Sequence, residues 1–274
     1  MNAVSRRALL GSILTGGGLI LAGCLDRPTE GDLEGDLSES AFEAFVEDKS
    51  AAEAALETTQ LSIDLGLSGD GQEASVAIDG EVNRIATVAS LDYDVDAPGP
   101  AAPWRPRGEF DTYFDDSALY YRSGTTWERY AYDEFEDLES EVAGIWSLEE
   151  LTVDEELYHY GDVTVSVGDD EILVTTECTG RELEAVGEGR PEQAVPGLDE
   201  VDGGAVDRIV FEESVEPETH YPNRVSIDGA FSDGDHEATM DSTIEFDDHD
   251  GPAIDEVPEQ VRSGAVDGER PTPF

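Results

Sequence analysis

The chain has 274 residues, of which 66 are acidic and 15 basic, giving a formal net charge of −51. Such a polyanion does not bind nucleic acid, because phosphates repel it, and at ordinary ionic strength its own charges oppose a compact state. Molar salt shortens the Debye length to about 3 Å and so screens this repulsion. The chain also has nine Phe, nine Tyr and three Trp, more aromatic residues than a disordered acidic chain contains. The composition therefore predicts a folded halophilic protein of haloarchaeal type.

The first 23 residues have the features of an export signal. Arg6 and Arg7 precede an uncharged run that continues to residue 25 and contains three consecutive glycines at 16–18. This run is too short and too rich in glycine to cross a membrane as a helix. The arginine pair resembles a twin-arginine export signal. The residues that end the run resemble the lipobox of secreted lipoproteins, whose cysteine is lipidated and becomes the new N-terminus: Leu21, Ala22, Gly23 and Cys24.

From this resemblance we expect a signal peptide over 1–23, a lipid anchor at Cys24 and a flexible acidic tether over 24–37. The protein would then lie on the extracytoplasmic face of the cell membrane, held by acyl chains.

A helix is expected over residues 40–58. Ser40 and Glu43 have the spacing of a capping box, and apolar residues then recur at helical spacing from Phe42 onward. Lys49 lies at the edge of this apolar stripe.

From residue 61 the apolar period changes to two, which is typical of strands. Strands are expected at 61–67, 74–80, 85–95, 110–114, 119–122, 126–130, 163–167, 172–175, 208–211, 224–227, 237–240 and 243–246. A proline-rich loop is expected at 98–106, a partly helical segment at 133–150 and a helical turn at 191–198.

Short hairpin connections predict an antiparallel sheet, and a sheet of this size curls rather than staying flat. The expected fold is α+β: a curled antiparallel sheet of about ten strands, forming an incomplete β-barrel around one or two helices. It would occupy residues 38–262 as one domain, with a disordered tail over 263–274. A two-sheet sandwich is the alternative.

Several stretches occur in the order found in the bacterial lipoprotein-carrier superfamily, which includes LolA-like proteins and LppX/LprG-type lipoproteins. They are ETTQLSIDLGL, ALYYRSGTTWERY, DVTVSVGDDEILVTTE, ETHYPNRVSIDG and STIEFDDHDGPAIDEVPEQV. The chain resembles this superfamily over residues 38–262 and departs from it in its acidity and in long inserts near 97–108 and 180–205. In that superfamily a half-barrel encloses an apolar cavity for acyl chains, so the resemblance implies a lipid or another apolar ligand.

Inward-facing apolar residues of the expected strands are the candidate cavity wall, and Trp146 is a candidate lid residue. The wall candidates are Leu61, Ile63, Leu65, Leu67, Val76, Ile78, Leu119, Tyr121 and Trp127. Alternation does not distinguish a hollow interior from a filled one. The alternative function is therefore a non-catalytic surface protein with a filled core that binds a protein partner of unknown identity.

No catalytic, metal-binding or cofactor-binding motif is recognisable, so we expect that the protein is not an enzyme and binds neither a metal nor a cofactor. The Asp and His residues at 233–237 and 247–250 lack calcium-loop spacing and are interpreted as solvated loops. With Cys24 lipidated, Cys178 has no partner for an intrachain disulfide and is interpreted as a small buried hydrophobic residue.

Overall fold

A computed structural model describes residues 33–69, 72–96, 108–132, 151–153, 155–180, 206–233 and 236–268. The expected export signal, Cys24, the proline-rich loop, Trp146 and the helical segments at 133–150 and 191–198 lie outside these residues. The helices are α1 (Glu39–Ala55), α3 (Glu155–Tyr160) and α6 (Glu259–Gly264). The strands are β1 (Leu33–Gly35), β2 (Thr58–Gly69), β3 (Gln72–Asn83), β4 (Val88–Asp96), β5 (Gly108–Phe114), β6 (Ala118–Ser123), β7 (Thr126–Ala131), β8 (Asp162–Val167), β9 (Ile172–Cys178), β10 (Val206–Val215), β11 (Pro222–Asp233), β12 (His236–Asp247) and β13 (Val266–Asp267).

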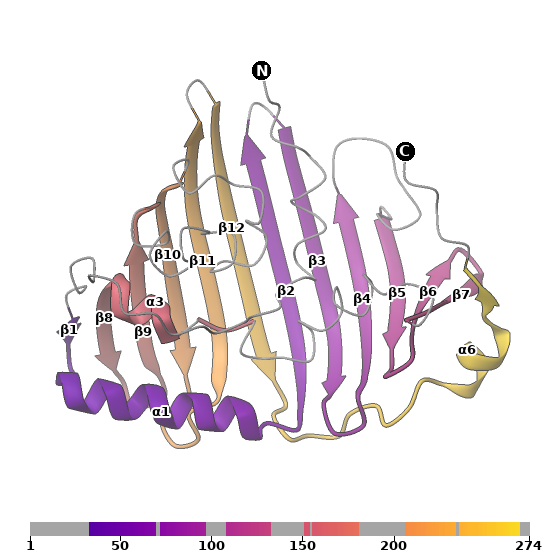
Figure 1. Cartoon of the computed structure of the whole chain (residues 1–274), viewed down its shortest axis with the longest axis horizontal. Helices are drawn as coiled ribbons and strands as arrows, with labels where there is room; N and C mark the ends of the chain where they lie inside the picture. Colours follow the sequence, from indigo (N-terminus) through magenta and orange to yellow (C-terminus); the bar gives the residue numbers. More distant parts are fainter. Residues whose placement is uncertain are drawn as a thin grey trace.

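The described strands form one curled sheet that does not close into a barrel (Figure 1). Their order is β1-β8-β9-β10-β11-β12-β2-β3-β4-β5-β6-β7-β13. Only the outermost pairs, β1 with β8 and β13 with β7, are parallel. The predicted curled antiparallel sheet is therefore confirmed, with 13 strands in place of about ten.

Two strand predictions need correction. Residues 237–240 and 243–246 belong to one strand, β12, which pairs along its whole length with β2 and β11. The third strand starts at Val88 rather than at Ile85, because Ile85 lies in the preceding turn and is 70% exposed, and Thr87, two residues later, has φ 54.

The predicted helix is confirmed as α1, but its N-cap differs from the expectation. The helix begins at Glu39, its N-cap is Ser38, and the Ser38 side chain makes no capping hydrogen bond to a backbone N–H of the helix. The predicted capping box at Ser40 is therefore wrong. Packing holds α1 in place instead: Phe42 and Phe45 are buried in the main core cluster.

Part of the expected tether belongs to the sheet. Leu33–Gly35 pair with Val163–Val165 as β1, and Asp36 donates its backbone N–H to Val165 O at 3.0 Å. Gly35 has φ 118, and a Cβ at this position would lie 2.0 Å from Val165 O. Only glycine fits here, because it alone adopts this φ freely and leaves room for the neighbouring carbonyl.

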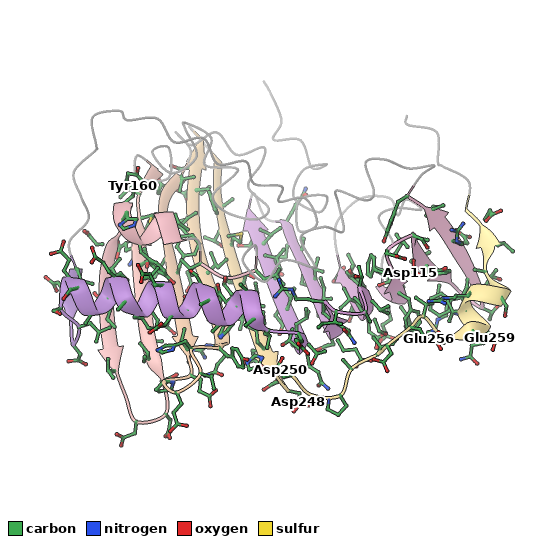
Figure 2. The ribbon with its side chains drawn as sticks, turned by 60° about the horizontal axis from the view of Figure 1, so that its bottom comes forward. Asp115, Tyr160, Asp248, Asp250, Glu256 and Glu259 are labelled. Atoms are coloured by element: carbon green, nitrogen blue, oxygen red, sulfur yellow. The ribbon has the colours of Figure 1, made fainter. Side chains whose placement is uncertain are left out.

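The chain after β12 runs along the lower edge of the sheet to the end formed by β7 and β13 (Figure 1). Figure 2 shows this segment passing Asp248 and Asp250 and then Glu256 before α6, which begins at Glu259. Helix α6 and β13 extend the described fold through residues 263–268, the first part of the segment expected to be a disordered tail. Val261 of α6 is buried and β13 pairs with β7, so this segment covers an edge strand that would otherwise expose unpaired backbone groups.

Candidate ligand-binding face

The inner face of the sheet, defined as the face against which α1 packs, is apolar. On β2 it carries Leu61, Ile63, Leu65 and Leu67, which lie opposite Gly80, Ile78, Val76 and Ala74 of β3. Successive residues of a strand point to opposite faces. Pairing therefore carries this largely apolar surface from β8 across to Leu119 of β6, and Phe42 and Phe45 of α1 belong to the same core cluster.

Helix α1 crosses the lower ends of β8 to β12 (Figure 1) and fills that part of the inner face. Val165, Val174, Val215 and Val225 there are at most 1% exposed. The inner face along β2, β3, β5 and β6 is less covered. Its partly buried apolar side chains, called here the half-exposed band, are Leu65, Leu67, Ala74, Phe110, Leu119 and Tyr121.

The candidate wall residues therefore divide into three groups. Leu61, Ile63, Val76 and Ile78 are buried core residues with at most 8% exposure. Leu65, Leu67, Leu119 and Tyr121 belong to the half-exposed band. Trp127 lies opposite Arg122 of β6, on the outer face, and packs with Val88, Tyr120 and Val261 in a second, smaller core.

Trp127 therefore does not line a cavity on the inner face, and its assignment to the wall is wrong. The second core exists because the segment containing α6 covers the outer face of β4 to β7. Trp127 packs there against Tyr113, with ring centroids 5.4 Å apart.

An aromatic stack that was not predicted from the sequence extends from the half-exposed band to β4. Tyr93 of β4 and Phe110 of β5 stack at 4.7 Å with an interplanar angle of 7°, and Tyr121 contacts Phe110 at 5.3 Å. Burial raises the pKa of the Tyr93 hydroxyl, so it stays neutral. The alternating pattern of the expected third strand contained the signal for Tyr93, since it places this residue on the face of Leu91 and Val95.

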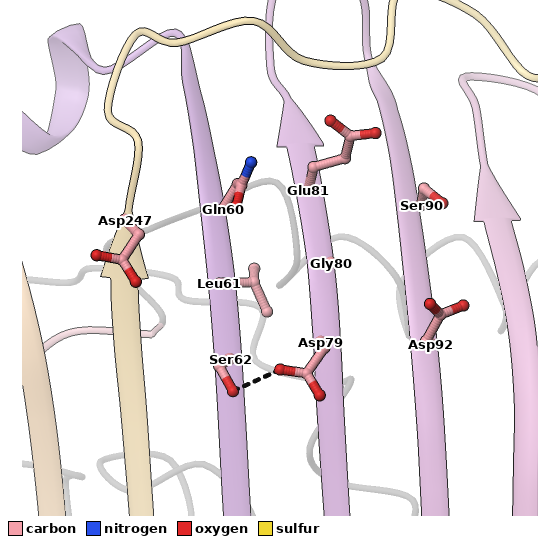
Figure 3. A pocket seen from close by; sticks show the side chains of 9 residues that line it. All are labelled: Gln60, Leu61, Ser62, Asp79, Gly80, Glu81, Ser90, Asp92 and Asp247. Carbon is pink, nitrogen blue, oxygen red and sulfur yellow. Dashed lines mark hydrogen bonds between the residues drawn. The ribbon is translucent and has the colours of Figure 1, made fainter.

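The outer face carries polar hollows. One of about 430 Å³ is lined by Gln60, Leu61, Ser62, Asp79, Gly80, Glu81, Ser90, Asp92 and Asp247 (Figure 3). Burial and the nearby Asp111 carboxylate raise the pKa of Asp92. This acidic, open hollow does not suit an apolar ligand. Within the described residues no group of His, Cys, Asp or Glu has an arrangement that could hold a metal.

Asp250 and His249, one of the two Asp/His stretches, have structural contacts. Asp250 accepts hydrogen bonds from Glu57 N at 3.0 Å and from Tyr221 Oη at 2.9 Å, and the Glu57 backbone N–H leads the causes that lower the pKa of Asp250. The His249 ring packs edge-on against Tyr221 at 5.1 Å, and burial lowers its pKa. The Glu57 contact joins the segment after β12 to the start of β2, and the Tyr221 contacts join it to the turn before β11.

The most unusual feature of the inner face is a buried charge cluster, called here the Lys49 cluster. Lys49 Nζ lies 3.0 Å from Glu53 Oε1, 3.3 Å from Glu213 Oε1 and 3.3 Å from Val153 O. Tyr158 donates its hydroxyl to Glu213 Oε2, and its ring centroid lies 5.7 Å from Nζ. The three charged residues are at most 3% exposed, so the expectation that Lys49 lies at the edge of the apolar stripe is wrong.

The electrostatics of the cluster follow from its burial. Burial lowers the pKa of Lys49, but the carboxylates of Glu213 and Glu53 outweigh it and raise the pKa overall, so the ammonium is retained. Burial raises the pKa of Glu53 by more than the Lys49 charge lowers it. One ammonium thus lies between two carboxylates, those of Glu53 and Glu213.

Cys178 is buried and 0% exposed, which confirms its interpretation as a small hydrophobic residue. Among the described residues, no helix has the length and apolar character needed to cross a membrane.

No protein-family model and no curated protein sequence matches the chain. Among solved structures, the chain is similar to the lipoprotein LppX of Mycobacterium tuberculosis, at 11% identity over 80% of this chain and 100% of that chain, with a TM-score of 0.42. It is also similar to LprF of Mycobacterium bovis (12% identity, 81% and 98% covered, TM-score 0.45) and to a DUF1329 family protein of Desulfovibrio piger (11% identity, 80% and 95% covered, TM-score 0.26). At these identities and TM-scores the similarities carry no argument about ligand or role.

Proposed function

We propose that this protein is a non-catalytic binding protein that holds an apolar ligand, with a lipid as first candidate, against the inner face of its curled sheet. The observation that carries the proposal is the half-exposed band, in which Leu65, Leu67, Phe110 and Leu119 stay partly accessible beside a well-packed core. Partly accessible apolar surface with few polar groups is typical of pockets for apolar ligands. The apolar surface is worth about 25 cal/mol for each Å² that a ligand removes from water.

The proposal includes the location. We infer that Cys24 carries a lipid and holds the domain on the extracytoplasmic face of the membrane, as the lipobox-like sequence indicates. Intact-mass measurement of protein extracted from membranes tests this inference. A start at Cys24 with added acyl mass supports it, and an unprocessed chain recovered from the cytosol contradicts it.

Mass spectrometry of lipids tests the binding function on protein purified in molar salt without detergent. We expect co-purified lipid at near-stoichiometric amounts. The matched variants are Leu67→Gln, in the half-exposed band, and Ser68→Gln, the next residue, which points to the outer face. Leu67→Gln should lose lipid and Ser68→Gln should keep it. Protein free of lipid, or equal lipid in both variants, contradicts the proposal.

A filled-core interaction protein is the second candidate. It is favoured by the full burial of Leu61, Ile63, Val76 and Ile78, four of the residues first considered as cavity wall. A lipid-free protein that crosslinks to one partner at the cell surface supports this alternative.

A further inference from the structure

The chain has a single lysine, and the fold places it in the core. Burying charge is costly, and replacing a buried ion cluster by apolar residues of similar volume is often neutral or stabilising. The Lys49 cluster is therefore poorly explained as a source of stability. What a buried charged contact does supply is a fixed register between the elements that it joins, since a slipped arrangement leaves charges unpaired.

The contacts of Lys49 differ in what they join. Glu53 lies four residues further along the same helix, so its 3.0 Å contact with Lys49 is internal to α1. Glu213 lies on β10, between Val174 of β9 and Val225 of β11 on the inner face. Its 3.3 Å contact with Lys49 is therefore an ionic link between helix and sheet.

Hydrogen bonds to Lys49 and Glu213 also tie two neighbouring segments to this contact. Val153 O accepts a hydrogen bond from Lys49, and Tyr158 of α3 donates to Glu213. The Tyr158 ring also packs edge-on against Phe42 of α1 at 5.6 Å. A displacement of α1 by one residue, about 1.5 Å along its axis, would disturb these contacts together.

Helix α1 lies over the filled part of the inner face, and its C-terminal end lies next to the start of β2 (Figure 1). The α1 helix ends at Ala55, and β2 begins three residues later. Along β2, Leu61 and Ile63 are buried, whereas Leu65 and Leu67 are partly exposed. The boundary between filled core and half-exposed band therefore runs between Ile63 and Leu65.

We propose that Glu213 and Lys49 are positioning residues that fix α1 in one register across the sheet and thereby set the length of apolar ligand that the half-exposed band accepts. The inference rests on the proposed function for its ligand, but its structural half stands separately. The link from Lys49 to Glu213 sets the register, and the link from Lys49 to Glu53 does not.

The two glutamates offer a matched test. Glu213→Gln and Glu53→Gln are near-isosteric, remove one carboxylate from the same cluster, and differ in whether that carboxylate lies on the sheet or on α1. Hydrogen exchange of α1 amides relative to β2 and β3 amides reports the register without any ligand. Equilibrium binding of a series of saturated fatty acids, from octanoic to palmitic, reports the length preference.

We expect Glu213→Gln to speed α1 exchange relative to the sheet by about ten- to a hundredfold, the factor expected for loss of one charged hydrogen-bonded contact, and to flatten the length preference. Glu53→Gln should leave both the α1 exchange rate and the fatty-acid length preference at wild-type values. Wild-type exchange in Glu213→Gln, or equal effects of the two variants, overturns the proposal.

If Glu213→Gln does not fold, the apolar replacement Lys49→Met with Glu53→Gln and Glu213→Met repeats the exchange measurement in a core without buried charges. Wild-type α1 exchange in that variant also overturns the proposal. If no fatty acid binds to the wild type, the proposed function fails, while the exchange comparison still decides whether the Lys49–Glu213 link fixes the register.

Discussion

Replacing Lys49 by Met should destabilise the fold in a manner that depends on pH. Methionine has a similar length and fills most of the same space, so the change removes a charge and leaves little cavity. Glu53 and Glu213, at 3% and 0% exposure, then remain without a cation. Breaking a buried ion pair by removing one partner costs about 3–5 kcal/mol.

The destabilisation caused by Lys49→Met has an upper limit, because a carboxylate that is left without a cation in an apolar interior takes up a proton rather than staying charged. Protonating a glutamate of ordinary pKa costs about 1.4 kcal/mol for each pH unit above about 4.3, hence about 3.7 kcal/mol at pH 7 and about 1 kcal/mol at pH 5. Burial already raises the pKa of Glu53 in the wild type, so Glu53 adds less to this cost than a carboxylate of ordinary pKa does. The destabilisation of Lys49→Met should therefore rise from about 1 to about 4 kcal/mol between pH 5 and pH 7.

Urea unfolding in molar potassium chloride measures this difference at several pH values. Salt screens the buried cluster little, because ions do not reach it. The control is Arg208→Met, which removes the cation of an exposed outer-face pair with Glu177 and should change the free energy of unfolding little at any of these pH values, because water screens an exposed ion pair. A destabilisation of Lys49→Met that is the same at pH 5 and pH 7, or as small as that of the control, refutes the reasoning.

Three further predictions concern the edge strand, the buried carboxyl and the charge. Gly35→Val places a Cβ 2.0 Å from Val165 O and should abolish the pairing of β1 with β8, seen as loss of hydrogen-exchange protection at the Asp36 amide. The control Gly264→Val, at a position with open space around it, should leave this protection unchanged. Equal protection of the Asp36 amide in both variants contradicts the prediction. The folded-state pKa of Glu53 is raised above 4.5, so the contribution of its proton uptake to the free energy of unfolding is complete below pH 4.5 and is lost as pH rises through the folded-state pKa. The free energy of unfolding of the wild type relative to Glu53→Gln should therefore fall as pH rises. A difference in urea unfolding that does not change with pH would show that the pKa of Glu53 is unperturbed. Dialysis from molar salt to about 0.1 M, where the Debye length grows to about 10 Å, should lower the Tm of a chain of charge −51; a Tm unchanged by salt in calorimetry would contradict the halophilic interpretation.

The local elements of this protein follow from local patterns. The change from helical to alternating spacing near residue 58 places α1 and β2 within about three residues of their observed bounds. Short polar turns between alternating segments lead to an antiparallel sheet, and its size leads to curling. The strand that was split at Asp241 and Ser242 shows the limit of this method, because the pairing of β12 with β2 continues through these two polar residues.

The candidate site depended on which face of each strand is covered. Alternation separates Trp127 and Arg129 from Glu128 and Tyr130, but both faces of β7 are partly apolar, and only the position of α6 shows that Trp127 packs outside. The half-exposed band depends likewise on which parts of the inner face other elements leave uncovered.

The sequence by itself determined the acidity, the expected anchor at Cys24, the helix and the apolar alternation, because each is set by residues close together in the chain. Tertiary structure alone decided that Lys49 meets Glu213 and that Trp127 faces outward. The partners of these residues come from strands and helices far away in sequence, and a buried charge is tolerated only where such partners converge.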